Sequence, residues 1–242
     1  MTDSSSLDLR EMARAAAPTL HAAPHLRDAA IATWHTRMIN EYASSRVFVA
    51  LARHLGALGF EEEADEVSQF ADEERRHGVL CGAVVEALGG EARGELESAP
   101  PYPEHHDAPP RAALLRNVIS ICCMSETVAV ALIGAERLEM PEGTELRALL
   151  TRIWADEIGH ARFGWRLLEK LAPSLSIAER DAIRAYLPIA FGHLEAHELL
   201  HLPARGGPPG GEALGLCSGL DARALLRETI DEVIAPRIQM LI

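Results

Sequence analysis

The chain has 242 residues, 48% of them hydrophobic, which is enough to fill the core of one large domain or of one domain with an appendage. Its formal net charge of −13 argues against nucleic-acid binding as the main role. The four cysteines form no Cys-x-x-Cys pair, so neither a zinc ribbon nor a rubredoxin-like iron site is expected. We find no secretory segment and no fully apolar run of about 18 residues, and so expect a cytoplasmic protein without membrane contact.

The first half of the chain predicts a helical hairpin preceded by a leader. Residues 1–24 are expected to be a loose or short helical leader, because prolines interrupt them. Apolar residues at helical spacing predict one helix over 26–58 and a second over 60–88, each ended by glycine. The proline-rich segment 91–109 is expected to be a long connection without regular structure, which is typical of functional loops and crossovers.

The same pattern predicts a second hairpin in the middle of the chain. A third helix is expected over 111–139, a tight turn at 141–143, and a fourth helix from there to about Leu171. No stretch alternates in the way that would predict a strand. We therefore expect an all-α protein whose residues 25–172 form an antiparallel four-helix bundle, with a long crossover between its second and third helices.

Residues 173–242 are expected to be a helical extension packed on the bundle. A fifth helix is predicted over 177–202, opened by a capping box in which Ser176 is the N-cap and Glu179 stands three residues later. A flexible segment rich in Gly and Pro follows. A last short helix is predicted over 221–233, with Pro236 limiting its extent.

Two Glu-x-x-His pairs, Glu74 to His77 and Glu157 to His160, are the candidate functional motifs. On a helix this spacing places a carboxylate and an imidazole on one face. The spacing alone is weak, because about one such pair is expected by chance and a third occurs at Glu198 to His201. The interpretation therefore depends on the surroundings of the two pairs.

The register of the two hairpins strengthens the interpretation. Glu41 lies about 16 residues before the first predicted turn and Glu74 about 14 after it, or roughly 24 and 21 Å along the two helices. Glu126 and Glu157 lie at similar depths, about 21 Å from the second turn. An antiparallel hairpin thus places Glu41 opposite Glu74 and Glu126 opposite Glu157.

Each acid also falls inside an apolar stripe of its predicted helix. The four stripes are Trp34, Met38, Glu41, Ser45 and Phe48; Val67, Phe70, Glu74, His77, Cys81 and Val84; Ile119, Cys123, Glu126, Val130 and Ile133; and Leu150, Ile153, Glu157, His160, Gly164 and Leu167. Four buried carboxylates without partners are strongly unfavourable, and two divalent cations would neutralise them. Carboxylate oxygens with one imidazole per ion suit iron or manganese. An amphipathic bundle with ordinary surface or ion-paired acids is the alternative, but it leaves the matched depths unexplained.

The predicted metal ligands are Glu41, Glu74, His77, Glu126, Glu157 and His160. This order resembles the ligand order of the ferritin-like diiron carboxylate superfamily, over about residues 26–171. The resemblance implies a ferritin-like bundle that holds two Fe ions, or Mn or mixed Fe/Mn, with Glu74 and Glu157 as bridges. The residues around both pairs are similar to motifs of bacterial diiron monooxygenases, which implies that Arg76 and Asp156 orient the imidazoles. An ordinary surface ion pair is the alternative for these two.

The resemblance implies a non-haem dinuclear iron oxidoreductase that activates dioxygen to oxidise or hydroxylate a small molecule. A separate electron-donor protein is expected, because no flavin or nicotinamide fingerprint occurs. Candidates for pocket lining or electron delivery, with core packing as the alternative, are Trp34, Phe48, Phe70, Cys81, Cys123 and Trp154. Two other functions stay open. One is a rubrerythrin-like peroxidase or ferroxidase that uses peroxide, although Ala129 stands where a seventh carboxylate is expected. The other is a non-catalytic helical protein with a structural metal site. A homodimer is a candidate assembly.

The third Glu-x-x-His pair has no partner at matching depth. It lies at the end of a predicted helix, where His193, His197 and His201 form a row at i, i+4 and i+8. Such a row can bind metal adventitiously, but a solvated helix edge or a packing surface is the favoured interpretation.

Overall fold

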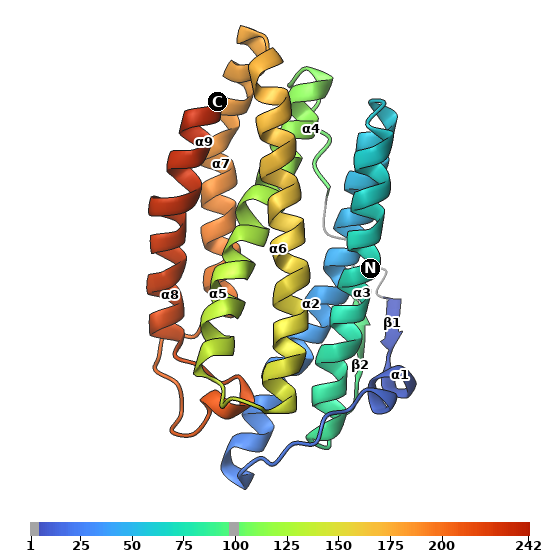
Figure 1. The fold of residues 1–242 in the computed structure, drawn as a ribbon, viewed down its shortest axis with the longest axis vertical. Helices are drawn as coiled ribbons and strands as arrows, with labels where there is room; N and C mark the ends of the chain where they lie inside the picture. Colours follow the sequence, from blue (N-terminus) through green and yellow to red (C-terminus); the bar gives the residue numbers. More distant parts are fainter. Residues whose placement is uncertain (1–4, 97–101) are drawn as a thin grey trace.

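The computed structural model describes residues 5–96 and 102–242, which are almost entirely helical (Figure 1). The long helices α2 (Pro24–Ala57), α3 (Glu61–Ala87) and α6 (Glu145–Leu171) run side by side. A further long helix is assembled from α4 (Pro110–Val118), a π-helical segment (Ile119–Ser125) and α5 (Glu126–Glu139). Helix α2 packs along α3, and α5 packs along α6. The prediction of an all-α protein with two helical hairpins is confirmed.

Local sequence signals account for the helix ends. The turn between α2 and α3 contains Gly59 at a φ of 81°, a left-handed conformation that glycine adopts without strain. Thr144 caps α6 by accepting a hydrogen bond from the amide of Arg147. The capping box predicted for the fifth helix is present in α7 (Ile177–His201), where Ser176 and Glu179 satisfy each other's backbone amides.

The third predicted helix is not uniform. In its π segment the backbone hydrogen bonds span five residues instead of four, and the Ser125 hydroxyl donates to the carbonyl of Ser120 over 3.2 Å. The sequence pattern gave no sign of this segment. The span Pro110–Glu139 is long and apolar enough to cross a membrane by length and composition, a criterion that buried core helices also meet. The absence of membrane contact stays a prediction.

The N-terminal residues were expected to be loose or a short helix; they contain a short helix and, in addition, a strand. Strand β1 (Ser5–Asp8) pairs antiparallel with β2 (Arg93–Leu96), and α1 (Arg10–Ala15) packs on α3. Leu7, Leu9 and Ala13 are buried there. The expectations of no strand, and of no regular structure over 91–109, are therefore wrong. The strands escaped prediction because four residues are too few to leave an alternating pattern. Pro100 and Pro101 of that connection lie outside the described residues.

The C-terminal residues pack on the bundle. Helix α7 lies against α4, and α8 (Gly219–Glu228) lies against α5. A π segment (Thr229–Ile234) and α9 (Ala235–Leu241) continue α8. The prediction that Pro236 limits the last helix is wrong. Pro236 stands in the first turn of α9, where a missing amide hydrogen is tolerated.

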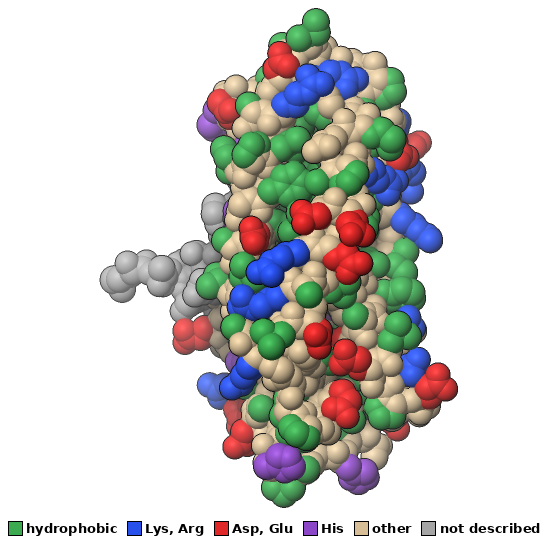
Figure 2. Space-filling model, turned by 90° about the vertical axis from the view of Figure 1, so that its left-hand side faces the viewer, with side chains coloured by type: hydrophobic (Ala, Val, Ile, Leu, Met, Phe, Trp, Pro, Cys, Tyr) green, Lys and Arg blue, Asp and Glu red, His purple; other side chains and the backbone are tan. Residues whose placement is uncertain are grey.

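The surface carries charges of both signs. Figure 2 shows acidic and basic side chains interspersed with apolar ones on one face of the molecule. That face therefore offers no continuous basic surface to a polyanion, in keeping with the net charge of −13.

Candidate metal centre

All six predicted ligands come together between the helices of the bundle. Glu41 comes from α2, Glu74 and His77 from α3, Glu126 from α5, and Glu157 and His160 from α6. They form two overlapping groups whose ligand atoms lie within 4.8 Å of one another, namely Glu41, Glu74, His77 and Glu157, and Glu74, Glu126, Glu157 and His160. Each group could hold a metal ion, and the two groups share Glu74 and Glu157.

The centre is closed to solvent on most sides. The side chains of Glu74 and Glu157 are each 3% exposed, and that of Glu126 is 11% exposed. Glu41, at 19%, is the most accessible of the six ligands. Four carboxylates with so little hydration require positive charge close by.

The Nδ1 atoms of both histidines point at this carboxylate cluster. Nδ1 of His77 lies 3.2 Å from Oε1 of Glu157, and Nδ1 of His160 lies 3.2 Å from Oε2 of the same residue. Glu157 thus faces one imidazole with each oxygen. His160 Nδ1 also lies 3.3 Å from Oε1 of Glu74. The buried Nδ1 of His77 makes no hydrogen bond of good geometry, which leaves it free for another partner.

A second layer of acids holds the other nitrogen of each ring. Nε2–H of His77 donates to Asp156 over 3.1 Å, and Nε2–H of His160 donates to Glu73 over 2.9 Å. With Nε2 protonated, a neutral imidazole presents the lone pair of Nδ1 to the centre. The pairing is crossed between the helices. Glu73 on α3 orients His160 on α6, and Asp156 on α6 orients His77 on α3.

Asp156 and Arg76 were predicted to orient the histidines, and Glu73 was not. Asp156 lies against His77 as expected, whereas Arg76 contacts the two acids rather than a ring, at 3.4 Å from Glu73 and 3.9 Å from Asp156. Glu73 was not assigned a role. The signal for it was present, since an acid directly precedes the ligand glutamate in both motifs.

Burial and mutual repulsion set the protonation of the carboxylates. Burial, followed by the charge of Glu157, raises the pKa of Glu74 to about 8. Burial and the same charge raise the pKa of Glu126 well above its usual range. Burial also opposes ionisation of Glu157, but hydrogen bonds from Glu126, His160 and His77 outweigh it and lower the pKa of Glu157.

The pKa values of the two imidazoles are raised as well, which favours their charged forms. Burial disfavours the charged ring of His77, yet Asp156, Glu157 and Glu41 raise its pKa to about 12. The pKa of His160 is also raised, by Glu126, Glu157, Glu73 and Glu74 against burial. Without metal, protons therefore neutralise the centre, and cations that bind there must displace them.

Aromatic side chains pack on the side of the centre where His160 lies. The ring centroids of Phe70 and Phe48 lie 4.4 Å and 5.2 Å from that of His160. Phe163 packs edge-on against Phe70, with centroids 5.5 Å apart. Of the predicted lining residues, Phe48 and Phe70 thus contact the candidate ligand His160. Trp34 and Trp154 instead donate to the backbone carbonyls of Leu214 and Val130, which fits core packing.

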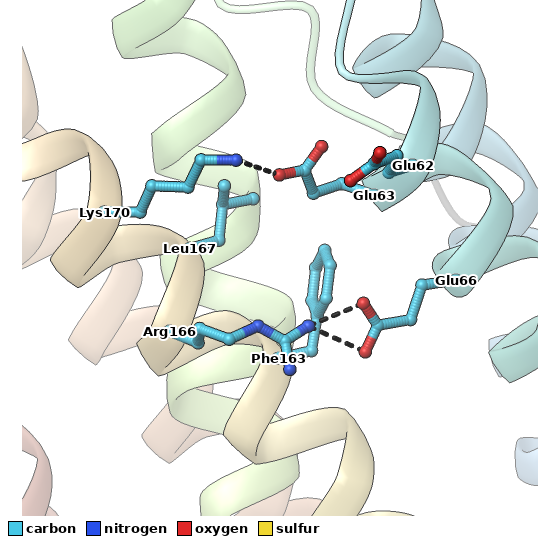
Figure 3. Close-up of a pocket in the computed structure, with 7 residues that line it drawn as sticks. All are labelled: Glu62, Glu63, Glu66, Phe163, Arg166, Leu167 and Lys170. Atoms are coloured by element: carbon cyan, nitrogen blue, oxygen red, sulfur yellow. Dashed lines mark hydrogen bonds and ion pairs between the residues drawn. The ribbon is translucent and has the colours of Figure 1, made fainter.

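A surface pocket lies on the outer side of Phe163. It has a volume of about 380 Å³ and opens between the start of α3 and the end of α6. Ion pairs between Lys170 and Glu63, at 2.6 Å, and between Arg166 and Glu66, at 2.7 Å, link these helices across it (Figure 3). Phe163 and Phe70 separate this pocket from His160.

Glycine allows the π segment and α6 to approach closely. A Cβ atom on Gly164 would lie 2.4 Å from Cβ of Cys122. Gly164 stands one helical turn after His160, and Cys122 stands one turn before Glu126. The close contact therefore fixes the distance between the helices that carry the candidate ligands Glu126 and His160.

Comparison of the chain with protein-family models, with curated proteins and with solved structures finds no match. The side chains of the centre are therefore the basis for inferring what it holds.

Proposed function

We propose that the protein binds two iron ions, or Mn or mixed Fe/Mn, in a ferritin-like bundle and activates dioxygen to oxidise a small molecule. The observation that carries this proposal is the pair of overlapping ligand groups with Glu74 and Glu157 in common. Two shared carboxylates suit two cations held side by side. The donor set, hard oxygens with one imidazole for each ion, favours iron and manganese over softer metals.

The six side chains would divide between the two ions. Glu41 and His77 would hold one ion and Glu126 and His160 the other, with Glu74 and Glu157 between them. The buried Nδ1 of His77 fits this assignment, because it makes no hydrogen bond of good geometry and a metal ion would satisfy it. Iron bound there would supply the electrons that reduce dioxygen.

The protein's own side chains prepare the centre. Asp156 and Glu73 hold the two imidazoles with Nδ1 turned inward, so little reorganisation accompanies metal binding. Phe48 and Phe70 keep water from the face of His160. The pocket outside Phe163 supports an entry route for dioxygen or a small substrate, since Phe163 lines the pocket and packs on Phe70, which packs on His160.

Metal analysis after anaerobic reconstitution with Fe(II) tests the proposal. We expect two ions per chain, and fewer in Glu157→Gln, which removes the charge of a shared ligand. Glu142→Gln is the matched control, because Glu142 is 91% exposed and should not affect metal content. A chain that binds no metal would contradict the whole proposal.

Dioxygen consumption then tests the chemistry. The loaded protein should consume dioxygen when a reductant is supplied, and the Glu157→Gln variant should not. Failure with every reductant would exclude oxygen activation. Rapid turnover of hydrogen peroxide by the Fe(II) protein without an organic substrate would instead indicate a peroxidase. Metal binding with neither activity would indicate a structural site.

A further inference from the structure

We infer a second, independent metal site on the surface of α7, formed by His197 and His201. The residues between them complete the sequence His197-Glu198-Leu199-Leu200-His201, in which two histidines stand four positions apart on one helix. On a helix this spacing places both rings on one face, where they can chelate a single ion. Both histidines are exposed.

The ring geometry supports His197 and His201 as the pair that binds. With Zn–N distances of about 2.0–2.1 Å, two imidazoles on adjacent positions of one ion have centroids roughly 5 Å apart. The centroids of His197 and His201 lie 5.1 Å apart, whereas those of His193 and His197 lie 6.5 Å apart. The first pair is thus already at the separation that chelation needs.

A carboxylate orients one of the two rings. Nδ1 of His197 lies 3.3 Å from Oε1 of Glu198. Because a carboxylate can only accept, Nδ1 carries the hydrogen and Nε2 keeps its lone pair for an ion. A metal-binding histidine commonly donates its second nitrogen to an acid in this way.

The end of α7 is held in place, so the pair is preorganised. Arg223 of α8 donates to the carbonyls of Leu199 and Leu202 at 3.0 Å and 2.6 Å, which prevents the last turn from fraying. His201 is the last residue of α7, and the C-terminal end of a helix favours positive charge. Two imidazoles with open remaining positions suit Zn²⁺, Cu²⁺ or Ni²⁺, which makes this site chemically different from the carboxylate centre.

Titration of the full chain with Zn²⁺ tests the site, with binding counted by calorimetry. Wild type should bind one more Zn²⁺ than His197→Gln, because His197 belongs to both possible pairs. His201→Gln should bind at this site at least about tenfold more weakly, since the second ligand of a chelate contributes through its high effective concentration. His193→Gln is the matched control and should bind as wild type does.

Copper provides a second readout, because each ligand group of the carboxylate centre holds one imidazole whereas this site holds two. One equivalent of Cu²⁺ should give an electron paramagnetic resonance spectrum with coupling to two imidazole nitrogens, and His197→Gln should abolish it. Equal Zn²⁺ stoichiometry in wild type and His197→Gln would overturn the inference. A loss in His193→Gln as large as that in His201→Gln would overturn it too.

Discussion

Replacing Gly164 by alanine should damage the fold and the metal centre together. The added Cβ would lie 2.4 Å from Cβ of Cys122 and 2.8 Å from its backbone carbonyl carbon. Backbone atoms cannot rotate away. Since ordinary contact begins at 3.4 Å, α6 and the π segment must separate by about 1 Å.

The expected loss follows from two opposing effects. Alanine favours a helix over glycine by about 1 kcal/mol, whereas overpacking of a close-packed interior costs about 1–3 kcal/mol and sometimes more. We expect the free energy of unfolding of metal-free Gly164→Ala to fall by up to about 2 kcal/mol. Because His160 and Glu126 lie one turn from the contact, metal affinity should fall by roughly tenfold or more, as misplacements of about 1 Å strongly impair such sites.

Gly159 provides the control on the same helix. A Cβ there would meet nothing within 4 Å, so Gly159→Ala should gain about 0.5–1 kcal/mol of stability and keep its metal. Urea unfolding of the metal-free variants and metal analysis after reconstitution give the two measurements. If Gly164→Ala were as stable as Gly159→Ala and kept two ions, the close contact would not control the spacing of the ligand helices.

Three further predictions concern the surroundings of the centre. Glu73→Gln and Asp156→Asn should each weaken metal binding by roughly 10–100-fold in competition with a chelator, and unchanged affinity in both would remove their orienting role. Burial raises the pKa of Glu74 from 4.5 to about 8 in the folded protein. Relative to the unfolded chain, the neutral carboxyl of Glu74 therefore contributes stability to the metal-free fold that is fully present below pH 4.5 and is lost as the pH rises through 8. The pKa of His77, raised to about 12, also makes the metal-free fold less stable as the pH rises above 6.5. The melting temperature of the metal-free protein should therefore fall from pH 4.5 to pH 8 while metal affinity rises, and the reverse trend in either would contradict these assignments. Phe163→Leu should speed the removal of metal by a chelator, and an equal effect of Lys170→Ala at the pocket rim would show that Phe163 is not the barrier.

The sequence predicted the helices well because each long helix has a complete apolar stripe. The first two helices were expected over 26–58 and 60–88, within two residues of the ends of α2 and α3. Short elements escaped prediction, because the pairing of β1 with β2 joins segments more than 80 residues apart and leaves no local pattern. The π segments escaped for a different reason. Each is a short segment of ordinary helical composition, so the apolar residues on either side of it still predict one continuous helix.

The six candidate ligands could be predicted because depth and face both follow from helix geometry. Chain distance from the turn sets the depth, and the apolar stripe sets the face. The partners of the ligands could not be predicted in the same way. Glu73 lies off the apolar stripe, where helix geometry alone cannot separate a surface acid from one that reaches a neighbouring helix.

Because an acid of the opposite helix holds each histidine, the geometry of the centre depends on how α3 and α6 pack together and not on either Glu-x-x-His pair alone. Glu73 and Glu74 are adjacent, so their side chains leave α3 about 100° apart, one toward the centre and the other toward α6. Asp156 and Glu157 do the same from α6 toward α3. Each histidine is therefore oriented only when the opposite helix is in register. A shift of one helix along the other would displace a ligand and, at the same time, release the ring it supports. Metal binding and the docking of α3 against α6 should consequently be lost together, whichever of the two is perturbed first.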